Sequence, residues 1–254
     1  MAIVTLHRPR KRNALTAGMW RELAQVARRI PQNPRTKVVI VRGAGNHFTA
    51  GSDISEFNRM SLEEVNRSFE LMEEAISAFE QMPLPTIGVM KGYALGAGFI
   101  LGLSMDLRVG GPGTVMGIPV GRLGITLSRD FLRRIVDLIG PSRTKDLVYT
   151  GRMFTAEECR QLGLVNYLVD DEEQVNQFAL KLAKKISGQS PASLMAVKER
   201  IALSRSSAEM PWKSSWDAGF VDPHDFPEGV RAFVEKRKPN FLQRRRLDAT
   251  ARGN

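Results

Sequence analysis

Two short glycine-containing turns carry the residues of this sequence that are best suited to stabilising negative charge. The first is the run HFTAGSDI at residues 47–54, and the second is the run KGYALGAGFI at residues 91–100. Each follows a β-type apolar run and leads into a helical pattern. Its small residues let backbone N–H groups approach a ligand closely. Two such turns facing one point predict a site for an oxygen that becomes negative during a reaction.

The basic residues suggest an anionic partner. The net charge is +10, and part of it is concentrated in residues 8–12 and 244–246. Such a surface attracts phosphates, nucleic acid or acidic membranes. Only 7% of the residues are aromatic, and the basic residues are not interleaved with aromatics, which disfavours nucleic acid as the partner. The histidines His7, His47 and His224 lack the spacing of metal ligands, so no metal site is expected.

The composition is that of an ordinary globular protein. Its 254 residues, 43% apolar and 25% charged, suit one large domain or a core domain with a helical appendage. No apolar run approaches the roughly 20 residues of a membrane helix, and the basic start of the chain gives no sign of a signal peptide. The single cysteine, Cys159, allows no internal disulfide, so a cytoplasmic location is expected.

Strands and helices alternate as far as about residue 120, which predicts βα units around a mostly parallel sheet. After about residue 172 the pattern is helical only, and a boundary is expected near residue 190. Ser61 with Glu64 and Thr155 with Glu158 have the spacing of capping boxes. Strands are expected at 2–6, 37–41, 86–90, 107–109 and 114–116, and helices after Thr16 and at 61–82, 98–103 and 128–139, the last closed by Gly140 and Pro141.

Five segments in a fixed order resemble the crotonase superfamily, the enoyl-CoA hydratase/isomerase family. They run from residue 6 to about residue 241. The segments are LHRPRKRNAL at 6–15, AGSDI at 50–54, GYALGAG at 92–98, TGR at 150–152 with AEE at 156–158 and GLV at 163–165, and EGVRAFVEKRKP at 228–239.

The resemblance implies an α/β fold, a crotonase-like spiral of ββα turns with a C-terminal helical region. Residues 1–190 would form the spiral core, and residues 191–254 the helical region that makes homotrimers or dimers of trimers. Proteins of this family bind acyl-CoA thioesters and stabilise a thioester enolate. No cofactor is expected apart from coenzyme A, which the substrate carries.

By position in the family's motifs, the backbone N–H groups of Ser52 and Ala97 would form the oxyanion hole. The neighbouring turn residues would contact substrate: Ala50, Gly51, Asp53, Ile54 and Gly96. The alternative is that the glycines only allow tight packing, and that Asp53 only holds its turn. Arg10, Lys11 and Lys236 resemble the basic residues that approach the phosphates of coenzyme A. General surface charge is the alternative for these three.

The two glutamates that hydratases of this family use are replaced. Their positions hold Ile100 and Val120, which cannot exchange a proton. The resemblance therefore favours isomerase or other variant chemistry over hydration. It also places Ile100 and Val120 in the wall of an apolar acyl pocket, with part of the helix at 61–82.

A different acid or base could compensate for this loss. Asp130 is the nearest carboxylate, although an acid in the first turn of a helix capped by Ser128 also has a purely structural use. Glu56 and Glu74 are further candidates, with surface charge as their alternative. Arg122 could meet a substrate carboxylate or form a surface ion pair. His47, at the start of the first run, could take part in catalysis, although this position usually points outward.

Three functions remain open at the level of the sequence. The first is an enzyme that stabilises an acyl-CoA enolate with altered acid/base groups. The second is an acyl-CoA-binding protein without catalysis. The third, which the low aromatic content disfavours, is a nucleic-acid-binding member of the family.

Overall fold

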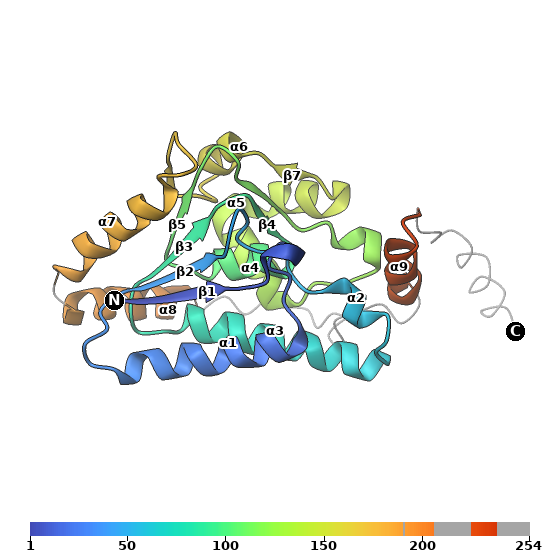
Figure 1. Ribbon diagram of the computed structural model, residues 1–254, viewed down its shortest axis with the longest axis horizontal. Helices are drawn as coiled ribbons and strands as arrows, with labels where there is room; N and C mark the ends of the chain where they lie inside the picture. Colours follow the sequence, from blue (N-terminus) through green and yellow to red (C-terminus); the bar gives the residue numbers. More distant parts are fainter. Residues whose placement is uncertain (190, 206–224, 238–254) are drawn as a thin grey trace, which may run out of the picture.

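The computed structural model describes residues 1–189, 191–205 and 225–237, and two sheets organise them (Figure 1). The larger sheet has the strand order β1-β2-β3-β5-β8, with every neighbouring pair parallel. In the smaller sheet, of order β4-β6-β7, β4 and β6 are parallel and β6 and β7 antiparallel. The strands are β1 (Ala2–Leu6), β2 (Val39–Gly43), β3 (Thr86–Met90), β4 (Tyr93–Leu95), β5 (Leu107–Gly110), β6 (Val115–Gly117), β7 (Met153–Phe154) and β8 (Tyr167–Leu168).

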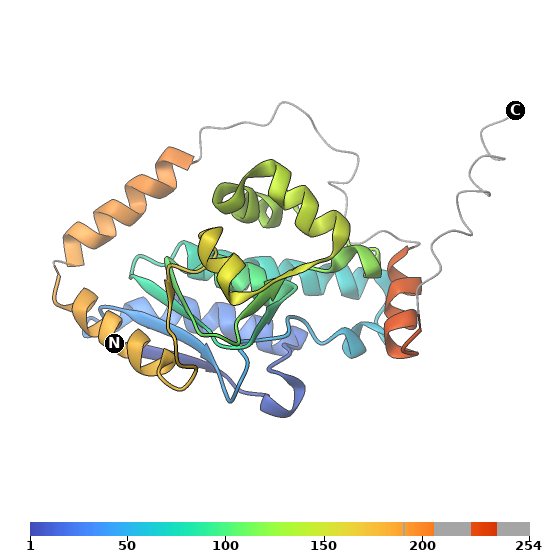
Figure 2. The same ribbon diagram turned by 90° about the horizontal axis from the view of Figure 1, so that it is seen from above.

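Helices cover both faces of the larger sheet (Figures 1 and 2). The α-helices are α1 (Ala17–Arg29), α2 (Ile54–Phe57), α3 (Leu62–Glu80), α4 (Ala97–Leu103), α5 (Arg129–Thr150), α6 (Ala156–Gln161), α7 (Val175–Ser187), α8 (Pro191–Arg205) and α9 (Asp225–Val234). Short 3-10 helices lie at η1 (Pro9–Lys11), η2 (Ile30–Gln32) and η3 (Val120–Leu123).

Alternation along β2 divides the core between these two faces. Successive side chains of a strand point to opposite sides of the sheet. Val39 and Val41 belong to the main cluster, with α1, α3 and α4. Ile40, and Val38 immediately before the strand, belong to a second cluster, which α7 covers. Because both faces are covered, β2 is an almost continuous run of β-branched residues, as buried parallel strands are.

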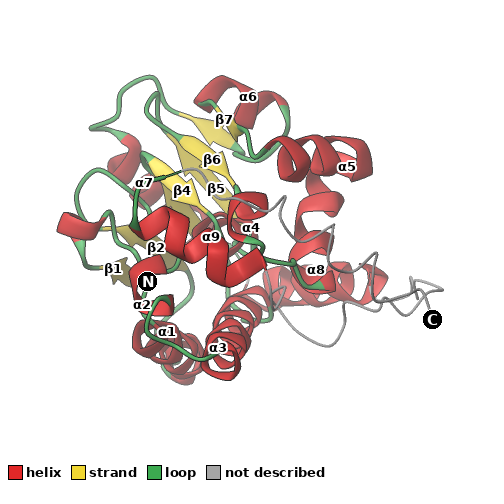
Figure 3. Cartoon of the chain, turned by 90° about the vertical axis from the view of Figure 1, so that its right-hand side faces the viewer, coloured by secondary structure: helices red, strands yellow, loops and turns green. Residues whose placement is uncertain are grey.

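The helix starts expected from the sequence are confirmed. Thr16 caps α1 through the N–H of Met19, and both capping boxes are formed, at Ser61 with Glu64 and at Thr155 with Glu158. The long helix α3 lies against α1 below the sheet, and Figure 3 shows the pair end-on. The caps at Thr16 and Ser61 fix the residues at which α1 and α3 begin, and so fix where the apolar faces of these two helices meet the sheet.

Two expectations need correction. The helix expected to close at Gly140 continues to Thr150, although Gly140 itself is non-helical, at φ 77° and ψ 167°. The glycine and proline therefore make a kink: Pro141 opens a second helical stretch, because its fixed φ suits a first helical turn. The second strand, expected at 37–41, lies at Val39–Gly43, since its register is set by pairing with β1 and β3.

The described parts of the region 191–254 are helical. They consist of α8, whose Lys198 pairs with Asp106 at 2.8 Å, and α9, which packs against η3 and α2. Residue 190 itself, the expected boundary, lies outside the described residues. The domain boundary and the trimer stay predictions. No helix among the described residues combines the length and the apolar character needed to cross a membrane.

Candidate active site

The two glycine-containing turns lie side by side, although about forty residues separate them in the sequence. Thr49 and Ala94 form a parallel bridge. The N–H of Thr49 donates to the carbonyl of Tyr93 at 2.9 Å, and the N–H of Leu95 donates to the carbonyl of Thr49 at 3.0 Å. The segment around Thr49 is therefore hydrogen-bonded to the segment at 93–95, and this pairing holds the two turns next to each other.

Glycine allows this close approach at Gly51 and Gly98. A Cβ added at Gly98 would lie 2.4 Å from Thr49 Cγ2, and one added at Gly51 would lie 2.5 Å from the Leu95 carbonyl oxygen. The same Cβ at Gly51 would lie 3.2 Å from the nitrogen of Ala97, which measures how near the turns are. Gly96 differs: its φ is +56° and a Cβ there would meet nothing within 4 Å, so this residue borders open space.

Two amides in these turns differ from their neighbours. The N–H groups of Gly51, Asp53 and Gly96 donate to Thr49 Oγ1, the Leu15 carbonyl and the Gly117 carbonyl, at 2.9–3.0 Å. Within the described part of the chain, the N–H groups of Ser52 and Ala97 donate no hydrogen bond. Ala97 is the first residue of α4, where the helix leaves its amides unsatisfied and carries partial positive charge.

The direction of each amide follows from the carbonyl in the same peptide plane. The Gly51 carbonyl accepts the N–H of Leu15 at 2.8 Å, and the Gly96 carbonyl accepts the N–H of Phe99 at 3.0 Å. In a trans peptide the C=O and the next N–H point in opposite directions. The Ser52 amide therefore points away from the segment at Leu15, and the Ala97 amide points out of the start of α4. An N–H group without a protein acceptor is able to donate a hydrogen bond to an anion.

Asn13 holds the first turn in place, and nothing in the sequence analysis singled it out. This fully buried side chain donates to the carbonyls of Ala44 at 2.9 Å and His47 at 2.7 Å, and accepts the N–H of Arg8 at 2.9 Å. Its φ is 55°, a left-handed conformation that asparagine adopts more readily than most residues. Asn13 belongs to the family signature at residues 6–15, and an asparagine at that place is the sequence signal that could have singled it out.

Asp53 is used to shape the turn. Its carboxylate accepts the N–H of Ser55 at 3.3 Å and the Ser55 hydroxyl at 2.5 Å, and pairs with Arg8 Nη1 at 3.1 Å. Burial opposes ionisation here, but the bonds from Ser55 and Arg8 outweigh it and hold the pKa of Asp53 below its ordinary value. The side chain is thus a charged cap for α2, and its contact with substrate stays a prediction.

His47, at the start of the first turn, contacts Tyr93 near the start of the second. Its ring stacks on Tyr93 with centroids 4.7 Å apart, and its Nδ1 accepts the Tyr93 N–H at 3.2 Å. Burial and the positive charge of Arg12 lower the pKa of His47, while Glu172 acts in the opposite direction. The structure therefore favours the neutral imidazole, which alone can accept this hydrogen bond.

Comparison with known proteins identifies the family. The sequence profile described as "Enoyl-CoA hydratase/isomerase" matches residues 1–244. A putative enoyl-CoA hydratase/isomerase of Bacillus subtilis, YngF, is 31% identical over 94% of this chain and 93% of its own length. The mevalonyl-coenzyme A hydratase sidH of Aspergillus fumigatus is 30% identical over 94% of this chain and 90% of its own.

A solved structure agrees with these relatives. An enoyl-CoA hydratase/carnitine racemase from Magnetospirillum magneticum superposes with a TM-score of 0.77 at 30% identity, covering 94% of this chain and 91% of that one. The chain belongs to the enoyl-CoA hydratase/isomerase family. It has the crotonase fold, as the resemblance in five segments implies. Proteins of the enoyl-CoA hydratase/isomerase family act on acyl-CoA thioesters, so an acyl-CoA-processing enzyme is the coarse functional assignment.

Ile100 and Val120 stand where the family resemblance predicts the two hydratase glutamates, and both positions are buried and apolar. Ile100 on α4 is 0% exposed, and Val120 at the start of η3 is 7% exposed. Both side chains belong to the main core cluster. Their contact with an acyl chain stays a prediction, but neither can transfer a proton.

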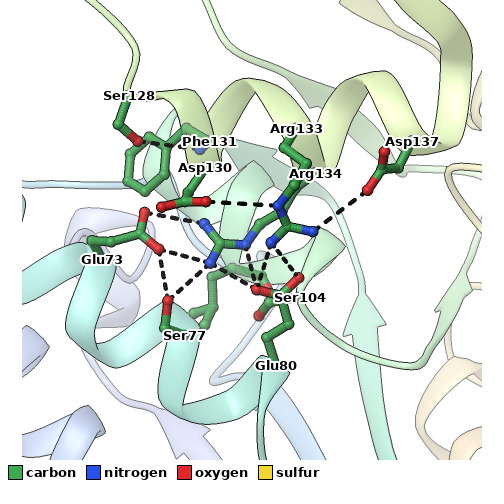
Figure 4. A network of polar contacts seen from close by, with 11 residues as sticks. Glu73, Ser77, Glu80, Ser104, Ser128, Asp130, Phe131, Arg133, Arg134 and Asp137 are labelled. Atoms are coloured by element: carbon green, nitrogen blue, oxygen red, sulfur yellow. Dashed lines mark hydrogen bonds and ion pairs between the residues drawn. The ribbon is translucent and has the colours of Figure 1, made fainter. Parts of the chain in front are cut away.

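The carboxylates considered as replacements have other partners. Glu56 accepts the N–H of Ala17 at 2.9 Å, which caps α1, and Glu74 pairs with Arg28 at 2.7 Å. Asp130 lies on the first turn of α5, with its side chain 61% exposed and 3.7 Å from Arg133 Nε (Figure 4). None of the contacts described for Asp130 reaches either turn. Its catalytic role stays a prediction.

The basic residues expected to meet coenzyme A lie on two segments near the site. Arg10 and Lys11 are exposed in η1, and the next residue, Arg12, accepts the N–H of Ala50 through its carbonyl at 2.9 Å. Lys236 is exposed just after α9, whose Phe226 packs on Phe57 of α2 with centroids 5.8 Å apart. Both segments therefore adjoin the first turn or the helix that follows it.

Proposed function

We propose that this protein is an acyl-CoA-processing enzyme that stabilises a thioester enolate with the amides of Ser52 and Ala97. The thioester carbonyl would bind between the two N–H groups, and negative charge would develop on its oxygen. One such donor typically contributes about 2.7–4 kcal/mol to a transition state. Because the donors belong to the main chain, the replacement of neighbouring side chains leaves this part of the chemistry intact.

The observation that carries the proposal is the contrast among the amides of the two turns. Neighbouring N–H groups are bonded within the described fold, whereas those of Ser52 and Ala97 donate to nothing there. Leaving a backbone donor unpaired is costly unless water or a ligand accepts its hydrogen bond. Two such donors in adjoining turns support a ligand oxygen as their shared acceptor.

Isomerisation or other variant chemistry fits the side chains better than hydration. Adding water across a double bond needs one group to activate the water and another to deliver a proton. Ile100 and Val120 occupy the positions of those groups and can do neither. Moving a double bond needs one proton-shuttling group, and Asp130 is the carboxylate to test for it.

A second candidate is a protein that binds acyl-CoA without turning it over. It is favoured by the structural partners of Asp53, Glu56 and Glu74 and by the exposure of Asp130. In either case we propose that Arg10, Lys11 and Lys236 contact the phosphates of coenzyme A. We also propose a homotrimer or a dimer of trimers, which sedimentation analysis would test, in the cytoplasm.

The variant Ala97→Pro tests the amide pair directly. Proline is favoured at the first position of a helix, and the N–H that it removes makes no bond in the fold. We expect Ala97→Pro to fold but to lose acyl-CoA binding and any turnover. Ala156→Pro, at the first position of α6, is the matched control and should keep both. Normal binding by folded Ala97→Pro would refute the proposal.

A substrate screen separates the enzyme from the silent binder. Crotonyl-, 3-enoyl- and aromatic enoyl-CoA thioesters would be offered to the wild-type protein and to Asp130→Asn. We expect turnover of a 3-enoyl thioester in preference to hydration of crotonyl-CoA. Tight binding without turnover of any thioester would favour the second candidate, and unchanged turnover in Asp130→Asn would remove Asp130 from the mechanism.

A further inference from the structure

The side chain of Ser52 is hydrogen-bonded inside the protein, to a tryptophan and a methionine. Its hydroxyl oxygen accepts the indole N–H of Trp20 at 3.3 Å and donates to the sulfur of Met72 at 3.0 Å. Trp20 on α1 and Met72 on α3 are both fully buried. The hydroxyl is therefore held between two core helices while the amide of the same residue remains without a protein acceptor.

The indole needs this acceptor. A buried tryptophan N–H without a partner is costly, and buried indoles nearly always find one. Residue 20 lies on the buried face of α1, together with Leu23, Ala24 and Ala27. The Ser52 hydroxyl thus satisfies a polar group in the centre of the main core cluster, and in return its own rotamer is fixed.

The main chain on both sides of Ser52 is fixed by a third segment. The carbonyl of Gly51 accepts the N–H of Leu15 at 2.8 Å, and the N–H of Asp53 donates to the carbonyl of Leu15 at 2.9 Å. These two bonds fix the main chain on either side of Ser52. The side-chain bonds of Ser52 into the core add a further restraint on the orientation of the turn.

We propose that Trp20 is a positioning residue of the active site, which acts through the Ser52 hydroxyl to aim the Ser52 amide at the ligand oxygen. The inference rests on the proposed function of that amide. Hydrogen bonds weaken steeply as the donor turns away from its acceptor. A donor aimed by the core therefore stabilises charge more than one that rocks with its loop.

Met72 extends the link to α3. This helix also carries Phe69 and Ile76, and the sequence predicts that part of it lines the acyl pocket. The Ser52 hydroxyl therefore joins the first turn to α1 through Trp20 and to α3 through Met72.

The test is the carbonyl stretching frequency of bound butyryl-CoA carrying 13C at the thioester carbonyl, measured by difference infrared spectroscopy. A saturated thioester avoids turnover, and the frequency falls as hydrogen bonds to the oxygen strengthen. In the wild-type protein we expect a clear shift to lower frequency on binding. Trp20→Phe keeps the aromatic bulk and removes the donor, so we expect a smaller shift and about threefold to tenfold weaker binding.

Two variants guard against a trivial loss of folding. Ser52→Ala removes the acceptor and should give the same reduced shift. The double variant Trp20→Phe with Ser52→Ala leaves no unpaired indole, so it should regain stability relative to Ser52→Ala but not the frequency shift. Phe154→Leu alters a buried aromatic residue on β7 rather than on α1 or α3, and should lower stability while keeping the wild-type shift.

The outcomes distinguish this inference from the proposed function. A full wild-type shift in Trp20→Phe or in Ser52→Ala would overturn the positioning role and leave the amide pair intact. A wild-type protein that binds butyryl-CoA with no shift would overturn the amide pair, and the positioning role with it.

Discussion

The two turns of the candidate active site and the contact between α3 and α5 are held together in different ways. At the turns main-chain hydrogen bonds join the two segments, and their close packing depends on glycine. Between the helices the working groups are charged side chains: Arg134, 2% exposed, bonds Glu73 at 2.7 and 3.1 Å and Glu80 at 2.8 and 3.0 Å (Figure 4). Ser77 accepts a further bond from Arg134 at 3.0 Å.

The carboxylates described near the turns and between these two helices have structural partners. Glu73 and Glu80 neutralise a buried arginine, Glu56 caps α1, and Asp53 caps α2. At Glu80 the charges of Arg134 and Arg133 outweigh the effect of burial and lower the pKa of the carboxyl group, which favours its ionised form. Chemistry that depends on amide dipoles does not need these groups.

The largest effect is expected from Arg134→Met. The substitution removes the buried cation and leaves two carboxylates facing each other, which costs about 3–5 kcal/mol of unfolding free energy. Arg133→Met is the matched control, because Arg133 is 34% exposed and its ion pairs contribute about 1 kcal/mol or less. Urea unfolding measures both, and acyl-CoA affinity should stay at the wild-type level in each. Equal losses in the two variants would contradict the contrast between buried and exposed arginines.

A substitution at the turns should reverse this pattern. Gly98→Ala forces a Cβ to within 2.4 Å of Thr49 Cγ2, so we expect a loss of about 1–3 kcal/mol together with a large loss of acyl-CoA affinity, because the turns move apart. Gly18→Ala in α1 is the control: its Cβ has room, and it should stabilise the helix by about 0.5–1 kcal/mol. Calorimetric titration and urea unfolding report the two quantities. Normal affinity in Gly98→Ala would mean that the spacing of the turns is not needed for binding.

The smallest effect is expected from His47, an ionisable group at the start of the first turn, through the pH dependence of the unfolding free energy. Its lowered pKa means that the folded state binds fewer protons than the unfolded state below about pH 6.5. Unfolding free energy should therefore fall as the pH drops from about 6.5, and level off below the folded-state pKa. His47→Gln should lose part of this dependence between pH 7.5 and 5.5, whereas His7→Gln, at an exposed histidine, should keep it. If the unfolding free energy of His47→Gln depended on pH as that of the wild type does, His47 would not be the source of this dependence.

The sequence predicted the parts of this protein that depend on local patterns. Ser61 and Thr155 begin helices because a capping box is complete within four residues. The family motifs located both turns and the positions of Ile100 and Val120. A mostly parallel sheet followed from the alternation of strands and helices, because parallel strands need a crossover between them.

The tertiary structure alone decided which side chains support the turns and which side chains hold α3 against α5. The partners of Trp20 and Arg134 lie 32 and up to 61 residues away, and no periodicity joins them. Asn13 holds the first turn only because the folded chain places the carbonyls of Ala44 and His47 within hydrogen-bonding distance of its side chain. A short-range pattern fixes a helix or a turn because its hydrogen bonds close within a few residues. The partner of a buried polar side chain is the group that the folded core places within about 3 Å of it. That distance is set only when the helices and sheets have packed.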